Sequence, residues 1–257
     1  AEVAEKGAVA LLVEEPVEVP ESVTVIQVKD TRYAMALVSA AWYDYPAEKL
    51  KVIGITGTKG KTTTTYMIKS ILESAGHKVG LIGTIETIIG ETHIPSSNTT
   101  PESVKIQEYF HRMLEDGCDM AVMEVSSQGL MLNRTAGIPF EIGIFTNIEP
   151  DHIGEGEHAS FAEYLFCKSR LMRQCRIGIV NRDDPHTERI LQGHTCSVET
   201  FSLWHPADVT AENIRFFMQS GELLGSFLVR VETAVYPVRM QLPGMFNVYN
   251  ALAAIGA

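Results

Sequence analysis

Residues 53–65 read Ile-Gly-Ile-Thr-Gly-Thr-Lys-Gly-Lys-Thr-Thr-Thr-Thr, and this stretch decides the fold of the chain. Its apolar start is typical of a buried strand, Gly57 and Gly60 allow a tight turn, and a helix-compatible stretch begins at Lys61. A strand, a turn and a helix N-terminus in this order direct several backbone N–H groups at one point, which suits a phosphate. The stretch therefore predicts a phosphate-binding loop between a strand and a helix.

The loop departs from the standard P-loop spacing. The pattern G-x-x-x-x-G-K-[ST] requires a glycine five residues before Gly60, where Ile55 stands. The shorter loop still offers Lys61 for the β- and γ-phosphates of a nucleotide and the Thr62 hydroxyl for Mg²⁺. A glycine-containing turn without a ligand is the alternative. Four threonines after a lysine make a poor helix start unless a phosphate or a metal stabilises them.

Composition limits the classes of function. The chain has 257 residues, of which 45% are hydrophobic and 21% charged, as in ordinary globular proteins. Its net charge of −11 argues against a nucleic-acid partner. The cysteines show neither a C-x-x-C pair nor zinc spacing, so reduced thiols are expected. We expect a cytoplasmic, monomeric protein with no membrane span and no secretory signal.

The pattern of apolar residues predicts two units. Residues 1–46 predict part of a small N-terminal α/β domain, with strands at 8–13 and 23–28 and a helix at 31–43. Residues 47–257 predict a central α/β domain with a mainly parallel sheet and helices on both faces, because its strands are continuously apolar. The segment up to Ala257 is helical without a C-cap signal, so we expect the chain to be a fragment.

Strands alternate with helices through most of the larger unit. The expected strands are 51–56, 79–84, 119–125, 141–146 and 176–181. The expected helices are 61–75, 102–116, 160–173 and 184–192. After residue 196 the pattern indicates an antiparallel addition as far as Tyr236, followed by a helix at 246–257.

Polar residues follow several of these strands, at the edge where open α/β sheets bind ligands. Glu124 ends the strand at 119–125, and an acidic residue near a phosphate loop suits Mg²⁺. A capping or ion-paired glutamate is the alternative. His152 follows the strand at 141–146 and is interpreted either as a contact to metal or phosphate or as a solvated loop residue.

The stretch Asn98-Thr99-Thr100-Pro101-Glu102 is both a loop and the start of a helix. Either threonine is expected to cap that helix, with the proline near its first position. A helix N-terminus at the crevice also forms an anion site, so a second anionic substrate is expected there. Arg134, eight residues after Ser126, suits a carboxylate or a phosphate, or else forms a surface salt bridge.

Several motifs together resemble the Mur ligase family, the ATP-dependent amide-forming enzymes of peptidoglycan synthesis. Residues 57–64 are similar to the family's GTxGKTTT loop, and the resemblance runs from about residue 8 to residue 257. Other motifs that match in order are Phe145-Thr146-Asn147, Asp151-His152, Asn181-Arg182-Asp183-Asp184 and residues 244–251. The motifs that look most like the MurE type, which adds the third amino acid to UDP-N-acetylmuramoyl-L-Ala-D-Glu, are Met123-Glu124-Val125-Ser126-Ser127, Asn98-Thr99-Thr100 and Arg134.

The resemblance implies roles for individual residues, with ATP and Mg²⁺ as cofactors and the UDP-muramoyl dipeptide and an amino acid as partners. The residues implied at the ATP phosphates are Gly57, Thr58, Lys59, Gly60, Lys61, Thr62 and Thr63. Those implied near adenine are Asn247 and Asn250. Those implied at Mg²⁺ are Thr62, Glu124, His152 and a carbamylated Lys168. Those implied at the dipeptide are Asn98, Thr99, Thr100, Ser126 and Arg134. The catalytic residues implied are Lys61, Lys168 and His152.

Two positions depart from the family pattern. Lys59 stands where the loop usually has Asn, and Gln128 stands where the MurE type usually has His, so Gln128 receives no acid–base role. The alternatives are a folylpolyglutamate-synthase-like ligase, which is expected to have Gly-Lys-Gly-Ser in the loop, another muramyl ligase, or a P-loop module without ligase activity. We expect the C-terminal ligase domain to be absent, so the sequence does not choose between L-Lys and meso-diaminopimelate.

Overall fold

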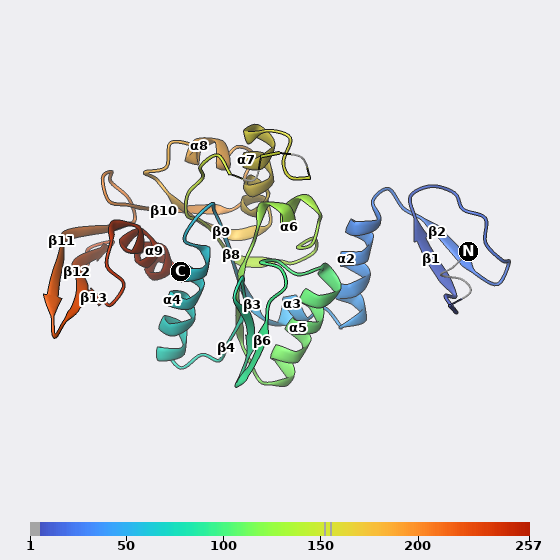
Figure 1. Ribbon diagram of the computed structural model, residues 1–257, viewed down its shortest axis with the longest axis horizontal. Helices are drawn as coiled ribbons and strands as arrows, with labels where there is room; N and C mark the ends of the chain where they lie inside the picture. The colour runs from blue at the N-terminus through green and yellow to red at the C-terminus, as the bar shows by residue number, and fades with distance from the viewer. Residues whose placement is uncertain (1–5, 152, 155) are drawn as a thin grey trace.

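Strands and helices alternate along most of the chain in the computed structural model, which describes residues 6–151, 153–154 and 156–257 (Figure 1). The strands are β1 (Ala10–Val13), β2 (Thr24–Gln27), β3 (Lys51–Thr56), β4 (Val79–Ile82), β5 (Glu86–Ile89), β6 (Thr92–Pro95), β7 (Met120–Glu124), β8 (Phe140–Phe145), β9 (Cys175–Asn181), β10 (Ser197–Ser202), β11 (Val209–Gln219), β12 (Glu222–Val231) and β13 (Ala234–Met240). The helices are α2 (Thr31–Trp42), α3 (Pro46–Lys49), α4 (Lys61–Ser74), α5 (Ser103–Glu115), α6 (Ser127–Met131), α7 (Phe161–Ser169), the 3₁₀ helix η1 (Arg170–Arg173), α8 (Thr187–Ile190) and α9 (Met245–Gly256).

One mixed sheet forms the centre of the molecule, in the order β13-β12-β11-β10-β9-β8-β3-β7-β4-β5-β6. The strands from β4 to β11 in this order run parallel to one another. Antiparallel pairs lie at both ends, between β4, β5 and β6 and between β11, β12 and β13. The prediction of a mainly parallel α/β sheet is confirmed.

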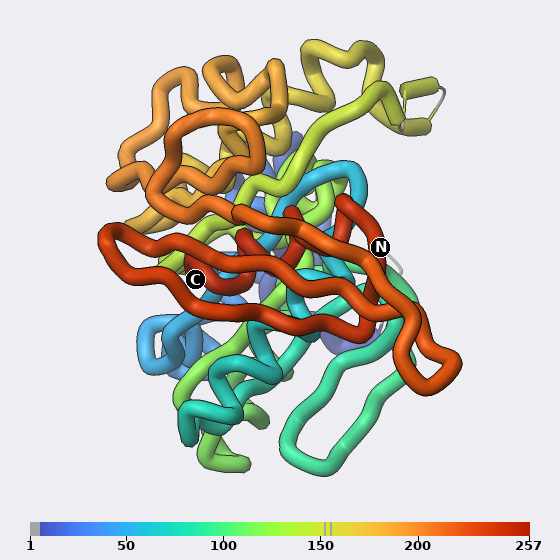
Figure 2. Tube along the Cα trace, turned by 90° about the vertical axis from the view of Figure 1, so that its left-hand side faces the viewer, coloured from blue at the N-terminus to red at the C-terminus, as the bar shows by residue number. Residues whose placement is uncertain are grey.

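The prediction of an antiparallel addition after residue 196 is confirmed for β11, β12 and β13 and is wrong for β10. β10 pairs with β9 in parallel, and the start of β11 pairs in parallel with the end of β10, where Phe201 lies opposite Val209. β12 pairs antiparallel with both β11 and β13, and the three strands lie side by side on the face that Figure 2 shows. An apolar strand pattern does not encode strand direction, because side chains alternate in the same way in both arrangements.

Helices cover both faces of the central strands. On one face, Ile53 of β3 packs with Ile68 of α4 and Leu252 of α9. On the other face, Val52 of β3 belongs to a cluster that contains Phe110 of α5 and side chains of α7. Successive residues of β3 point to opposite faces, so its continuous apolar sequence supplies both cores. Burial of each such large side chain stabilises the fold by about 1.5–3 kcal/mol.

The N-terminal unit lies at the opposite end of the molecule from β11, β12 and β13 (Figure 1). It consists of the parallel pair β1–β2 and of α2, which packs against α5. The helix α3 then leads into β3, close to the expected boundary between residues 46 and 47, which stays a prediction. Among the described residues, no helix has the length and apolar composition needed to cross a membrane.

Some local expectations differ from the structure. The helix α5 begins at Ser103, with Glu102 as an N-cap residue that makes no side-chain cap bond, so neither Thr99 nor Thr100 caps it. The Thr100 hydroxyl instead bonds across the sheet edge, to Glu124 O at 3.0 Å. The hairpin β5–β6 and the short helix α6 were not expected, and α8 is shorter than the expected helix at 184–192.

Candidate active site

The phosphate loop lies between β3 and α4, as the sequence predicts. Gly57 and Gly60 have φ angles of +155° and +87°, and Gly60 is the N-cap residue of α4. A Cβ atom on residue 57 would lie 2.0 Å from Thr146 Oγ1, so only glycine fits there. Thr62 and Thr63 occupy the first turn of α4, where backbone N–H groups have no partner within the helix.

Residues at the end of the neighbouring strand β8 hold the loop in place. Asn147 Oδ1 accepts a hydrogen bond from Lys59 N at 2.9 Å, and Asn147 Nδ2 donates to Lys59 O at 3.0 Å. Thr146 Oγ1 also donates to Lys59 O, at 2.9 Å. The sequence located this polar pair after an apolar strand without assigning it a role. These contacts fix the conformation of the loop backbone.

Two lysines converge on one carbonyl of the loop. Lys61 Nζ donates to Gly57 O at 2.9 Å and to Thr58 O at 3.1 Å, and Lys168 Nζ donates to Gly57 O at 2.8 Å. The pKa of Lys168 is held well below its usual range by burial and by repulsion from Lys61. Burial also lowers the pKa of Lys61, although Glu124 opposes this shift. The positive charge of Lys61 makes this point of the loop favourable for an anion.

Tyr164 supports the same loop from α7. Its hydroxyl lies 3.0 Å from Thr58 Oγ1, which also accepts a hydrogen bond from Glu149 N at 3.0 Å. Its ring lies under the Lys168 ammonium, with 4.5 Å between Nζ and the ring centroid. Burial raises the pKa of the Tyr164 phenol. No sequence motif singled out Tyr164, because its helical spacing to Lys168 resembles that of ordinary core residues.

Glu124 lies at the end of β7 beside the loop, and only 1% of it is exposed. Its Oε1 accepts hydrogen bonds from Thr62 Oγ1 at 2.9 Å and from Thr84 N at 2.8 Å, and its Oε2 accepts one from Thr84 Oγ1 at 3.0 Å. A buried carboxylate requires such donors. The structure brings Glu124 and Thr62 together as predicted and adds Thr84, which directly follows a buried apolar strand and its glycine.

The donor set fits Mg²⁺ bound together with phosphate. Glu124 and Thr62 offer oxygen atoms, and Mg²⁺ usually takes one or two protein oxygens together with phosphate oxygens and water. In the part of the chain that the structure describes, no group of three or more His, Cys, Asp or Glu side chains is arranged to hold a metal ion. The ammonium of Lys168 has no lone pair for a metal, so this residue fits only as a carbamate. His152 lies outside the described residues.

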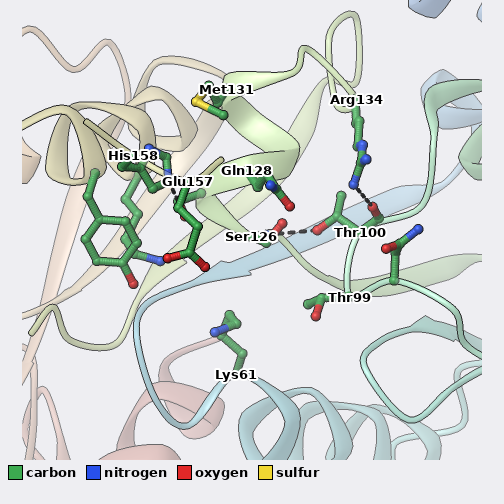
Figure 3. A pocket seen from close by; sticks show the side chains of 13 residues that line it. Lys61, Thr99, Thr100, Ser126, Gln128, Met131, Arg134, Glu157 and His158 are labelled. Atoms are coloured by element: carbon green, nitrogen blue, oxygen red, sulfur yellow. Dashed lines mark hydrogen bonds between the residues drawn. The ribbon is translucent and has the colours of Figure 1, made fainter. Parts of the chain in front are cut away.

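A cavity of about 170 Å³ opens beside the two lysines (Figure 3). It contains all five residues that the sequence assigned to substrate, together with Lys61 and Lys168. The assigned residues are Asn98, Thr99, Thr100, Ser126 and Arg134. The other lining residues are Ser127, Gln128, Met131, Glu157, His158 and Tyr164. Lys61 of the phosphate loop and the expected substrate residues therefore line one cavity at the carboxyl edge of the sheet.

Hydrogen bonds connect this cavity to the buried carboxylate of Glu124. Thr100 Oγ1 donates to Glu124 O at 3.0 Å and accepts from Ser126 N at 2.9 Å. Thr84 Oγ1 lies 3.1 Å from Thr99 Oγ1, within hydrogen-bond distance, and Ser126 Oγ caps α6 through Gly129 N at 3.0 Å. One hydrogen-bond network therefore joins the expected substrate residues to Glu124.

The first turns of α9 lie against the phosphate loop. Asn250 Oδ1 accepts a hydrogen bond from Thr64 Oγ1 at 3.4 Å, and Asn250 Nδ2 donates to Asn247 Oδ1 at 3.2 Å. Asn247 Nδ2 in turn donates to Pro243 O at 3.0 Å. Of the two asparagines that the resemblance placed near adenine, Asn250 therefore lies next to the loop, and Asn247 contacts Asn250.

Asp183 anchors the start of α9 to the end of the sheet. Its carboxylate accepts hydrogen bonds from Ser202 Oγ at 2.5 Å, Leu203 N at 2.6 Å and Tyr249 OH at 2.8 Å. His205 Nδ1 lies 2.7 Å from the same group. Asp183 belongs to the motif Asn181-Arg182-Asp183-Asp184, from which no role was predicted for it. Its contacts show that it holds Tyr249, the residue before Asn250, in place.

These features define a class of protein. A phosphate loop after a central parallel strand, an oxygen pair suited to Mg²⁺ and an adjoining polar cavity are those of a nucleotide-binding α/β enzyme domain. Residues 55–257 match the Mur ligase middle domain. The chain belongs to the Mur ligase family.

Relatives and solved structures agree with this assignment. The chain is 44% identical over 254 residues to UDP-N-acetylmuramoyl-L-alanyl-D-glutamate--2,6-diaminopimelate ligase 1 of Clostridium acetobutylicum, covering 98% of this chain and 51% of the relative. It is 42% identical over 255 residues to the corresponding ligase of Clostridium perfringens, covering 97% of this chain and 51% of the relative. The chain thus spans about half the length of these curated relatives.

The fold is shared with solved structures. A structure of a UDP-N-acetylmuramoyl-L-alanyl-D-glutamate--2,6-diaminopimelate ligase superimposes with a TM-score of 0.85 at 25% identity, covering 98% of this chain and 51% of that one. A folylpolyglutamate synthase of Mycobacterium tuberculosis, complexed with ADP and AMPPCP, has a TM-score of 0.68 at 15% identity, covering 87% and 57%. The second similarity shows a common fold alone. The predicted family and fold are confirmed.

Proposed function

We propose that this chain is the ATP-binding part of a ligase that adds the third amino acid to UDP-N-acetylmuramoyl-L-Ala-D-Glu during peptidoglycan synthesis. The main support is the cavity that contains Lys61, Lys168 and all five expected substrate residues. Because the relatives are named for 2,6-diaminopimelate, this amino acid is the first to test. We further propose that the protein acts as a cytoplasmic monomer, where ATP is available.

The proposed reaction activates a carboxylate. The terminal carboxylate of the nucleotide-linked peptide attacks the γ-phosphate of ATP, which gives an acyl phosphate and ADP. The amino group of the incoming amino acid then attacks the acyl carbon, and inorganic phosphate leaves. A free carboxylate is a poor acyl donor because its oxygen is a poor leaving group. Phosphorylation by ATP removes this obstacle.

The residues of the chain position two anions and neutralise their charge. Lys61 and the N–H groups at the start of α4 bind the phosphates, while Thr100, Ser126 and Arg134 hold the peptide in the adjoining cavity. Mg²⁺ bound at Thr62 and Glu124 would neutralise further phosphate charge. The contacts of Thr146 and Asn147 keep the loop in its binding conformation before the substrates arrive.

We propose that Lys168 acts as a carbamate. Addition of CO₂ requires a neutral amine, and the burial that lowers the pKa of Lys168 favours that form. The modification replaces a cation by an anion able to help place the metal. The proximity of Lys168 to Gly57 O, at 2.8 Å, puts this group directly at the phosphate loop.

A phosphate-release panel on the full-length protein tests the proposal. We expect phosphate release to require ATP, UDP-N-acetylmuramoyl-L-Ala-D-Glu and one amino acid together, with diaminopimelate and L-Lys compared in parallel. Release that proceeds fully with ATP alone would indicate a P-loop module without ligase activity. Release that requires a different carboxylate acceptor, such as a folate or another muramoyl nucleotide, would assign the chain to another branch of the family.

A further inference from the structure

Arg134 enters the cavity in a fixed orientation (Figure 3). Its side chain is only 11% exposed. One terminal nitrogen, Nη1, donates to Thr100 O at 3.0 Å, and the other, Nη2, lies 2.5 Å from Glu102 Oε1. Among the described residues, Nε of this guanidinium is buried without a hydrogen-bond partner. The group is therefore held at its two ends and retains donor capacity.

Glu102 stands between two guanidinium groups. It directly precedes α5, and its carboxylate contacts Arg134 on one side and Arg32 Nη1 of α2 on the other, at 3.5 Å. Its side chain is 44% exposed and forms no cap bond to α5. Within the described part of the chain, Glu102 is the one carboxylate that forms an ion pair with Arg134. The position of Glu102 is therefore explained by its contact to Arg134 and not by helix capping.

The ion pair between Glu102 and Arg134 sets the orientation of the guanidinium plane. A largely buried guanidinium requires an anionic or polar partner, because desolvation of an isolated charge is costly. With Glu102 removed, Arg134 keeps its bond to Thr100 O, and its plane is free to rotate about that contact. Recognition of a carboxylate or phosphate by arginine depends on the orientation of its planar N–H groups. Removal of Glu102 therefore leaves Arg134 without a fixed orientation for binding an anion in the cavity.

We propose that Glu102 is a positioning residue that sets Arg134 for the anionic group of the nucleotide-linked peptide. This inference rests on the proposed function, since it takes the nucleotide-linked peptide as the substrate of the cavity. It predicts a defect that is confined to one substrate. The apparent affinity for the nucleotide-linked peptide falls, while the affinity for ATP stays unchanged, because the phosphate loop does not contact Glu102.

The test measures steady-state kinetics of the full-length enzyme with UDP-N-acetylmuramoyl-L-Ala-D-Glu as the varied substrate. For Glu102→Ala we expect KM for the nucleotide dipeptide to rise about tenfold, with KM for ATP within about twofold of wild type. Glu102→Gln retains an acceptor oxygen, so its rise is smaller. Thermal melting of each variant is recorded, because a merely structural role would lower Tm and would not separate the two KM values.

Two control variants isolate the contact. Glu108→Ala removes another glutamate of α5, which pairs with Lys105 and Arg112, and its KM values are expected to equal those of wild type. Arg32→Gln removes the second neighbour of Glu102 but leaves the contact to Arg134 in place. Its KM for the nucleotide dipeptide is expected to stay within about twofold of wild type.

Each outcome decides the inference. An unchanged KM for the nucleotide dipeptide in Glu102→Ala overturns it, and so does an equal rise of both KM values. A fall in that KM also overturns it, because the carboxylate would then compete with the substrate for Arg134. Wild-type enzyme that releases phosphate without the dipeptide contradicts the proposed function instead. Calorimetric titration of wild type and Glu102→Ala with the nucleotide dipeptide gives the same comparison for binding alone.

Discussion

Gly60 of the phosphate loop lies directly against Asn250 of α9, although the two residues are far apart in the sequence. A Cβ atom on residue 60 would come within 2.3 Å of Asn250 Oδ1. Gly60 also has a φ angle of +87°, which L-residues rarely adopt. The glycine therefore serves both the turn of the loop and the close approach of α9.

Gly60→Ala is expected to weaken nucleotide binding at least tenfold, because Asn250 must move away and the loop loses its helix-start geometry. Gly76→Ala is the matched control. Gly76 has a similar φ angle of +94°, but a Cβ atom there would meet nothing within 4 Å. Both substitutions introduce backbone strain that lowers the free energy of unfolding by about 1–2 kcal/mol, which denaturant unfolding measures. Only Gly60→Ala is expected to change the affinity for a fluorescent ADP analogue, and equal affinities would contradict the contact as a functional one.

Lys61→Ala is expected to reduce ligation by about 100-fold or more, because the phosphates lose a preorganised positive charge in a shielded site. The fold is expected to persist, since the hydrogen bonds lost are those from Nζ to Gly57 O and Thr58 O. Lys105→Ala, an exposed lysine of α5 paired with Glu108, is the control and is expected to retain activity. Phosphate release and circular dichroism give the two readouts. Near-normal turnover by Lys61→Ala would refute the phosphate-loop assignment.

Lys168→Ala is expected to lose ligation that excess bicarbonate does not restore. Small carboxylates such as acetate are expected to restore part of it, because they replace the anionic end of the carbamate. Lys61→Ala is the matched control, since a carboxylate cannot replace its cation. The rescue assay measures phosphate release at increasing carboxylate concentration. Restoration by a small amine, with none by carboxylates, would show that the ammonium bonded to Gly57 O is the active form.

The sequence predicted contacts wherever the sheet edge alone brings residues together. Glu124 and Thr62 follow adjacent parallel strands, so their meeting depends on strand direction and little else. The role of Thr84 was not predicted, because it depends on β4 ending level with Glu124 in the neighbouring strand β7. Residue spacing does not reveal this register. Thr100 was expected to cap α5 because local rules favour it, but its tertiary bonds to Glu124 O and Ser126 N prevail.

The contacts of Arg134 and Asn250 lay beyond sequence reasoning for another reason. Arg134, which follows α6, contacts Thr100 and Glu102 just before α5, and Asn250 approaches Gly60 because α9 packs against α4. The motif that holds Asn250 indicated a nucleotide, yet its contact with Gly60 follows only from how α9 packs on the sheet. The resemblance supplied candidate residues, and the packing supplied their partners.

Asp183 is expected to make the stability of the protein sensitive to acid. Burial raises the pKa of its carboxyl group, but hydrogen bonds from Ser202, the Leu203 N–H, His205 and Tyr249 outweigh this and lower the pKa below 3.8. A carboxyl group whose pKa is lower in the folded state stabilises that state above its unfolded pKa. This contribution is lost as the pH falls through the lowered pKa, because the native carboxylate must then accept a proton.

Asp183→Asn replaces one acceptor oxygen by an NH₂ group that faces donors. At pH 7 we expect its free energy of unfolding to be about 1–3 kcal/mol below that of wild type. The difference should narrow as the pH falls below 3.8 toward the lowered pKa of the folded state, since the unfolded wild-type carboxyl group then binds a proton more readily than the native one. Urea unfolding at pH 7, 5, 4 and 3 measures both proteins. Glu188→Gln, an exposed neutral substitution in α8, is the control and should lie within about 0.5 kcal/mol of wild type. A difference that stays constant over this pH range would show that Asp183 acts through the shape of its hydrogen bonds and not through its charge.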